Sequence, residues 1–179
     1  MASALISPSV LFPGRCCQGS GSDRYSDLGP RAGPAGAQVT WETMSTTISL
    51  SCWAPVSLDY AWDCWTSPDG LRRWWWPHLS DTTYHVDARV GGRYAISCPS
   101  AQIAVQGTLL ALERPQLLRM SWRWGVEAGE GDDDLVEVRF VRREDGVHVT
   151  VTHEVLRADE VEAYVQGWNG VMDQFAQLR

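Results

Sequence analysis

Tryptophan is the residue whose number and spacing in this chain most directly suggest chemistry. Trp74, Trp75 and Trp76 follow one another, and the chain holds ten Trp in 179 residues. Three consecutive indoles are too large for one packed side of a helix, so we expect some of them to face an internal cavity or solvent. A short Trp-rich helical segment, followed by strands around the paired glycines Gly91 and Gly92, is what a protein needs to enclose an apolar small molecule.

The side chains that would line such a pocket are selected by element and by face. The alternative is that they simply fill the core, but ten Trp exceed what a core of this size usually needs. An empty cavity of roughly 200 Å³ would cost about 5 kcal/mol, against a total stability of about 7–15 kcal/mol, so we expect a filled pocket. The ligand-binding candidates are Trp65, Trp74, Trp76, Tyr94, Trp122, Trp124, His153, Trp168 and Met172.

His153 is the best polar candidate. It continues the inward face of Val147, Val149 and Val151, close to the start of the last predicted helix. There it could orient a ligand carboxyl group or act as a general base. A structural histidine with its hydrogen bonds satisfied is the alternative interpretation.

The charged residues suggest structure more than chemistry. Asp87 and Arg89 lie two apart in one predicted strand, where Arg89 could hold an anionic ligand or the pair could fix the turn that follows. The run from Glu127 to Asp134 holds five carboxylates without the order of a calcium loop, so it predicts a solvated hairpin loop. The His and Cys residues show no metal-ligand spacing, and we expect no metal and no cofactor.

Composition excludes several classes of protein. The net charge is −7 and all fifteen cations are Arg, so lysine Schiff-base chemistry and a P-loop lysine are excluded. An acidic chain without a basic run is expected to bind nucleic acid and anionic membranes poorly. No stretch approaches the roughly 20 apolar residues of a membrane span. The five Cys form no C-x-x-C pair and no secretion signal is evident, which predicts free thiols in the cytoplasm.

A Gly/Pro-rich segment precedes the first regular pattern. Residues 1–43 hold ten Gly or Pro and no sustained periodicity, so they cannot bury enough apolar surface to offset their ordering entropy. We therefore expect one domain over residues 44–179, preceded by a disordered extension or a misassigned start.

Two short helices should follow a first strand at about 46–54. Ser57 is a suitable N-cap for the first helix, and Ser67 followed by Pro68 begins a second one that runs through Arg73. Six strand-like runs come next, and three of them alternate between apolar and polar residues, which favours an antiparallel sheet with one buried face. These runs cover about 82–88, 93–98, 103–112, 117–124, 135–142 and 147–155.

The last strands and a long helix complete the pattern. Asp145 and Gly146 form a hairpin signal between two strands. Apolar residues spaced by three and four predict a helix at about 158–178, in which Gly167 and Gly170 suggest a close backbone approach or a bend. The fold class is therefore α+β, with a curved antiparallel sheet wrapped around a long C-terminal helix. Space between a bent sheet and a straight helix can hold a ligand.

The order and spacing of these motifs resemble the SRPBCC (START-like, helix-grip) superfamily, within it the branch of the activator of Hsp90 ATPase homologue 1-like C-terminal domain. The resemblance covers about Thr46 to Leu178 and implies the helix-grip fold with an apolar pocket between sheet and helix. It rests on Ala54, Pro55, Trp62, Trp65, Pro68, Leu71, Trp74, Trp75, Trp76, Pro77, Asp87, Arg89, Gly91, Gly92, Tyr94, Gly107, Pro115, Trp122, Gly167 and Trp168.

Three functions are compatible with this sequence. We expect a protein that binds a small apolar or aromatic molecule in a Trp-lined pocket. The first alternative is a cyclase- or hydratase-type enzyme with His153 and Tyr94 as its acid/base pair. The second is a co-chaperone-like interaction module that uses an outer charged face of Arg119, Arg123, Glu137 and Arg139.

The expected partners follow from the same family resemblance. In the co-chaperone an additional N-terminal domain takes part in engaging Hsp90, and residues 1–43 are too short and too rich in Gly and Pro to form one. We therefore do not expect a chaperone partner. A homodimer is compatible with the sequence.

Overall fold

A computed structural model describes residues 45–125 and 133–179 of the chain. Its strands are β1 (Thr46–Ala54), β2 (Thr83–Val86), β3 (Arg93–Cys98), β4 (Ile103–Glu113), β5 (Leu117–Trp124), β6 (Asp134–Arg143) and β7 (Gly146–Val155). Its helices are α1 (Leu58–Thr66), α2 (Pro68–Leu71) and α3 (Val161–Ala176), with 3₁₀ turns at Pro99–Ala101 and Ala158–Glu160. The predictions for residues 1–43 and for 126–132 lie outside the described residues.

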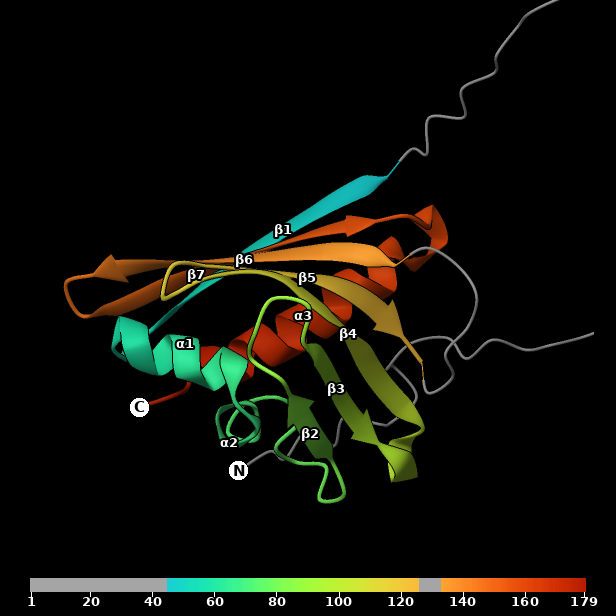
Figure 1. The fold of residues 1–179 in the computed structure, drawn as a ribbon, viewed down its shortest axis with the longest axis horizontal. Helices are drawn as coiled ribbons and strands as arrows, with labels where there is room; N and C mark the ends of the chain where they lie inside the picture. The colour runs from blue at the N-terminus through green and yellow to red at the C-terminus, as the bar shows by residue number, and fades with distance from the viewer. Residues whose placement is uncertain (1–44, 126–132) are drawn as a thin grey trace, which may run out of the picture.

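The seven strands form one antiparallel sheet in the order β1-β7-β6-β5-β4-β3-β2. Figure 1 shows the sheet curving over α3, with α1 and α2 at one end of the same face. The register between β4 and β5 shifts between Leu109 and Ala111, and a bulge of this kind bends a strand. The predicted α+β helix-grip architecture is confirmed.

The local signals for the two short helices are also confirmed. The Ser57 side chain accepts a hydrogen bond from the backbone N–H of Tyr60 at 3.2 Å. The Ser67 side chain accepts one from Gly70 at 3.0 Å, and Pro68 occupies the first turn of α2. Each hydroxyl satisfies a donor that the start of a helix leaves unpaired. The second helix ends at Leu71, two residues before the predicted end.

The core lies between the sheet and α3. On β7 the side chains of Val147, Val149, Val151 and His153 are fully buried, as their alternation predicts. The buried stripe of α3 comprises Tyr164, Trp168, Val171, Met172 and Phe175. This stripe packs against the sheet because its members recur every three or four residues on one side of the helix.

Four local predictions are corrected. The hairpin between β6 and β7 turns at residues 144–145, and Gly146 is already the first residue of β7. A Cβ on Gly170 would meet nothing within 4 Å, so this glycine does not mark a close approach. The long helix begins at Val161, after a 3₁₀ turn. Asp134 is not part of a solvated loop, because it is the buried first residue of β6.

The turn between β2 and β3 explains the pair of glycines. The β2 strand ends at Val86, so Asp87 and Arg89 lie in the turn itself, joined by an ion pair of 2.8 Å. Gly91 has a φ of 79°, which residues with a side chain rarely adopt. A Cβ on Gly92 would collide with the backbone oxygen of Asp87. The two glycines therefore allow the tight turn, and the exposed Asp87–Arg89 ion pair lies within it.

Candidate functional site

The three consecutive tryptophans lie in an irregular segment between α2 and β2. All three are buried, with exposed fractions of 0%, 3% and 5% for Trp74, Trp75 and Trp76, so none of them faces solvent. Outside a helix, successive side chains are free to point in different directions. Trp76 has a φ of 50°, a conformation that costs a bulky residue about 1–3 kcal/mol. The backbone is therefore strained where it spreads the three rings.

Two small cavities adjoin this segment. The first, which we call the helix-side cavity, lies between β5, α3 and the Trp segment. Aromatic rings form most of its wall, and the remainder comes from one turn of α3. Its lining residues are Trp75, Trp76, Trp122, Trp124, Tyr164, Gly167, Trp168 and Val171.

The second space, which we call the sheet-side cavity, lies under β2, β3, β4 and β5. Its wall is made of aromatic and aliphatic side chains and one Met. Trp75 and Trp122 belong to both walls and therefore separate the two cavities. The lining residues are Trp65, Leu71, Trp75, Val86, Tyr94, Ile96, Leu109, Leu118, Met120 and Trp122.

Both cavities are much smaller than the 200 Å³ considered from the sequence. Each cavity has a volume of about 20 Å³, which is room for about one water molecule. At ~24 cal/mol per Å³, an empty space of this size costs only about 0.5 kcal/mol. The cost of empty space therefore does not require a ligand.

Unpaired hydrogen-bond donors in these walls cost more. The indole N–H groups of Trp65, Trp75 and Trp122 are buried and have no acceptor among the residues that the structure describes. Each such donor costs about 1–3 kcal/mol. The free-energy cost of the three unpaired donors is several times that of the two empty cavities. The main destabilising feature of this region is therefore its unpaired hydrogen-bond donors.

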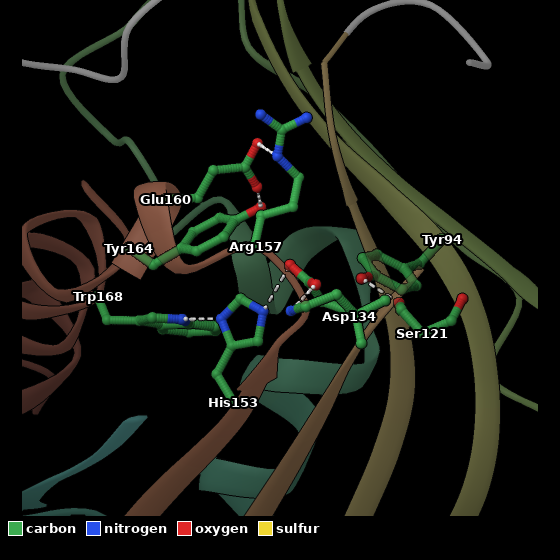
Figure 2. A network of polar contacts seen from close by, with 9 residues as sticks. Tyr94, Ser121, Asp134, His153, Arg157, Glu160, Tyr164 and Trp168 are labelled. Carbon is green, nitrogen blue, oxygen red and sulfur yellow. Dashed lines mark hydrogen bonds and ion pairs between the residues drawn. The ribbon is translucent and has the colours of Figure 1, made fainter. Parts of the chain in front are cut away.

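His153 is held from both sides by hydrogen bonds, next to Trp168 of the helix-side cavity wall. The Trp168 indole N–H donates to His153 Nδ1 at 3.0 Å, and His153 Nε2 lies 3.3 Å from a carboxylate oxygen of Asp134 (Figure 2). An indole nitrogen can only donate, so Nδ1 must be the acceptor and the neutral ring carries its proton on Nε2. The other oxygen of Asp134 accepts the backbone N–H of Leu156 at 2.9 Å.

This hydrogen-bonded chain affects the neighbouring titrating groups. Burial raises the pKa of Asp134, but the hydrogen bonds from His153 and Leu156 outweigh it, and the net pKa lies below the ordinary value. The Tyr164 hydroxyl donates to Glu160 at 3.3 Å, and Arg157 pairs with Glu160 at 3.1 Å (Figure 2). Burial and the carboxylates of Asp134 and Glu160 raise the pKa of Tyr164.

Tyr94 lies in a separate part of the site. Its hydroxyl donates to the backbone oxygen of Ser121 at 2.8 Å. Burial, with Asp133 and Tyr164 nearby, raises the pKa of Tyr94 well above the ordinary value. Tyr94 lines the sheet-side cavity, whereas His153 lines neither cavity.

The structure distributes the nine candidate residues over three environments. Trp76, Trp124 and Trp168 line the helix-side cavity, Trp65 and Tyr94 line the sheet-side cavity, and Trp122 lines both. Three candidates lie outside both walls, and they are Trp74, His153 and Met172.

Sequence reasoning missed three residues of this region. Trp75 is absent from the predicted set, although it lines both cavities. Tyr164 precedes Trp168 by one helical turn on the same stripe, a spacing that would have identified it. The acidic composition predicts a loop at Asp134, and only its position at the start of β6 shows that it is buried.

The charged side chains on the outer face of the sheet form ion pairs with one another. Glu137 lies 3.2 Å from Arg119 and 2.7 Å from Arg139, and Arg123 contacts Asp133 at 2.6 Å.

Within the described residues no group of three or more His, Cys, Asp or Glu could hold a metal ion. None of the helices in this part of the chain has the length and apolar character needed to cross a bilayer.

Comparison with solved structures supports the fold. An AHSA1-like protein from Aeromonas hydrophila is 24% identical, with 74% of this chain and 90% of that one covered and a TM-score of 0.60. Protein CV1439 from Chromobacterium violaceum is 23% identical over 73% and 94% of the two chains, with a TM-score of 0.59. CalU16 from Micromonospora echinospora is 23% identical over 73% of each chain, with a TM-score of 0.57. At these identities the likeness shows the fold alone.

Sequence comparison identifies the family. A search of curated proteins finds no match. The family model for activator of Hsp90 ATPase homolog 1-like proteins matches residues 55–179, which is most of the chain. The chain therefore belongs to the activator of Hsp90 ATPase homolog 1-like family, a branch of the helix-grip SRPBCC superfamily.

Proposed function

We propose that this protein binds a small, mainly apolar or aromatic molecule in the space between the curved sheet and α3. The observation that carries the proposal is the pair of adjoining cavities, which share Trp75 and Trp122 and have aromatic and aliphatic walls. Concave apolar spaces with a few polar groups are the usual form of small-molecule sites. Burial of the ligand would contribute about 25 cal/mol per Å² of apolar surface.

Binding requires one indole to move, because each cavity has room for about one water molecule. Trp75 is the best placed, since it lines both cavities and lies outside the helices and strands. Its backbone oxygen accepts the Tyr84 hydroxyl at 2.7 Å, which holds the main chain. Its indole N–H has no acceptor in the described residues, so rotating the ring breaks no hydrogen bond there. Such a rotation would join the two cavities.

The geometry does not favour the acid/base alternative. Both ring nitrogens of His153 are engaged, and Trp168 occupies the one that would accept a proton. The Tyr94 hydroxyl is committed to Ser121, and its raised pKa opposes ionisation. We therefore assign His153 the role of orienting Trp168 in the cavity wall.

A reducing compartment fits the cysteines of the described residues. Cys52, Cys64 and Cys98 are free thiols. Burial, with a contribution from Asp173, raises the pKa of Cys52 to about 11, which keeps it protonated and unreactive at neutral pH. We propose a cytoplasmic location on this basis.

Two matched glycine variants test the binding site. Gly167 lines the helix-side cavity, whereas a side chain on Gly170 would enter open space. Both changes to Leu raise helix propensity, but only Gly167→Leu fills the cavity. We expect native mass spectrometry of the gently purified full chain to show an added mass that organic extraction removes. We expect Gly167→Leu to lose this mass and Gly170→Leu to keep it.

A panel of small aromatic compounds, measured by isothermal titration calorimetry, extends the test to protein that purifies empty. Binding that Gly167→Leu weakens more than tenfold, with Gly170→Leu unchanged, would support the proposal. A clean mass together with no binding across the panel would refute it.

A further inference from the structure

His153 combines complete burial with a side chain of the kind that can change its charge near neutral pH. Its exposed fraction is 0%, and imidazole is the side chain that most often takes up a proton in the physiological range. The two ring nitrogens have opposite roles (Figure 2). Nδ1 accepts the indole N–H of Trp168 at 3.0 Å, and Nε2 donates to Asp134 at 3.3 Å. Only the neutral ring with its proton on Nε2 satisfies both neighbours.

The other side chains around the imidazole are uncharged. They come from β1, β5, β6 and α3, and they are Ile48, Trp122, Val136 and Tyr164. The next charged groups lie beyond the Tyr164 ring, where Glu160 and Arg157 form an ion pair of 3.1 Å. The charged group that faces the imidazole directly is therefore Asp134.

A series of hydrogen-bonding groups connects the buried ring with solvent. The Tyr164 hydroxyl contacts Glu160 at 3.3 Å and also hydrogen-bonds with the carboxylate of Asp134. The Glu160 side chain is 31% exposed, whereas that of Asp134 is 9% exposed. A proton from solvent can therefore reach His153 through Glu160, Tyr164 and Asp134 without unfolding of the sheet.

A proton on the ring changes its two contacts in opposite ways. The pKa of Asp134 lies below 3.8, so this carboxyl is still ionised between pH 7 and pH 4 and an added proton stays on the imidazole. Towards Asp134 the proton creates an ion pair and removes a net buried charge, which is favourable. Towards Trp168 it places Nδ1–H against the indole N–H, and neither group can accept. The ion pair holds the imidazole in place, so the indole has to move.

We propose that His153 is a pH-sensitive latch, whose neutral ring holds Trp168 in the wall of the helix-side cavity and whose protonated ring releases it. The release itself needs no ligand, and its consequence for binding rests on the proposed function. Trp168 lines the helix-side cavity, with its ring centre 4.9 Å from that of Trp122. Its displacement breaks this wall, so a molecule bound there is released in acid.

NMR spectra of the wild-type full chain test the latch directly. As the pH is lowered from about 7.5 to about 4.5, the Trp168 indole N–H resonance should move upfield with the same midpoint as the His153 imidazole. The Trp74 indole is the internal control, because it donates to the backbone oxygen of Cys64 at 2.9 Å and that acceptor does not titrate. A Trp168 resonance that stays in place while the imidazole takes up its proton would overturn the inference. An imidazole that stays neutral until the protein unfolds would overturn it as well.

Substitution of the competing donor gives a second readout. In Trp168→Phe nothing opposes a proton on Nδ1, so the imidazole should take it up at a pH about one unit higher than in the wild type. Trp62→Phe is the matched control, because Trp62 is equally buried and packs against Phe140. It should leave the midpoint unchanged, and equal midpoints in all three proteins would contradict the latch.

A calorimetric titration with toluene separates the latch from the proposed function. We expect toluene to bind the wild type at about pH 7.5 and about tenfold more weakly one pH unit below the imidazole midpoint, where about a tenth of the rings are neutral. An affinity that does not change across the midpoint would overturn control of the site by His153. Failure of toluene and of the whole aromatic panel to bind at about pH 7.5 would overturn the proposed function, whereas the spectra would still decide the latch.

Discussion

Replacing Asp134 by Asn removes a charge from the Trp168–His153–Asp134 chain and leaves its shape almost unchanged. The new amide oxygen can still accept the backbone N–H of Leu156, now 2.9 Å from the carboxylate. The amide nitrogen then faces His153 Nε2–H, and two donors cannot bond. Moving the ring proton to Nδ1 only transfers the conflict to Trp168, whose indole N–H lies 3.0 Å from that atom.

One buried donor is therefore left unpaired in either tautomer, at a cost of about 1–3 kcal/mol. We expect Asp134→Asn to lower the free energy of unfolding by about 2 kcal/mol at pH 7. Urea unfolding of the full chain, followed by far-ultraviolet circular dichroism, measures this difference. Asp133→Asn is the control, because Asp133 is the neighbouring carboxylate and its ion pair with Arg123 is partly exposed. Pairs of that kind contribute about 0–1 kcal/mol.

The pH dependence provides a second measurement. The folded-state pKa of Asp134 lies below its ordinary value of 3.8 because its hydrogen bonds outweigh its burial. A carboxyl with a lowered pKa stabilises the fold above its unfolded pKa, and this contribution is lost as the pH falls through the folded pKa. The difference between wild type and Asp134→Asn should therefore be complete at pH 7 and shrink below about pH 4. A loss no larger than that of Asp133→Asn, or a difference that persists in acid, would refute the assignment.

The other predictions concern Gly107, Gly170 and Asp81, which lie outside the hydrogen-bonded series of Trp168, His153 and Asp134. Gly107→Ala should lower the free energy of unfolding by about 3 kcal/mol or more in the same urea assay, because its Cβ would collide with the backbone of β5. Gly170→Ala should raise it by about 0.5–1 kcal/mol, and equal effects of the two changes would contradict the packing described. Hydrogen bonds from Cys98 and Ser100 lower the pKa of Asp81 to about 2, so its contribution to stability should be present above pH 4 and lost towards pH 2. An NMR titration of the Asp81 carboxyl with a midpoint near 4 would disagree.

Period-2 alternation was enough to place most of the sheet. Leu118, Met120 and Trp122 share the buried face of β5, and His153 continues the buried face of β7, as expected from the sequence. Ser57 and Ser67 mark the starts of α1 and α2 because a cap is a local interaction. Features that depend on neighbours in sequence were therefore predictable.

Features that depend on distant neighbours were not. The burial of all three rings from Trp74 to Trp76 follows from an irregular backbone, with Trp76 at a positive φ, which no periodicity describes. The acidic composition around Asp134 suggested solvent exposure, whereas the start of β6 places that residue beside His153. Cavity volume depends on how rings from five elements meet, and side-chain type alone could not give it.

The crowding of the indoles also determines how the protein responds to light. Among the tryptophans of the described residues, Trp53 is exposed by 45% and lies on the outer face of β1, whereas the rings of Trp65, Trp75, Trp76, Trp122 and Trp168 near the cavities are buried. Trp122 lies 4.9 Å from Trp168, and Trp75 lies 5.7 Å from Trp168, between ring centres. Excitation energy passes readily between indoles at such separations. Light absorbed by any ring of the cluster therefore samples the others before emission, so a molecule that quenches one wall of the cavity dims the fluorescence of the whole cluster.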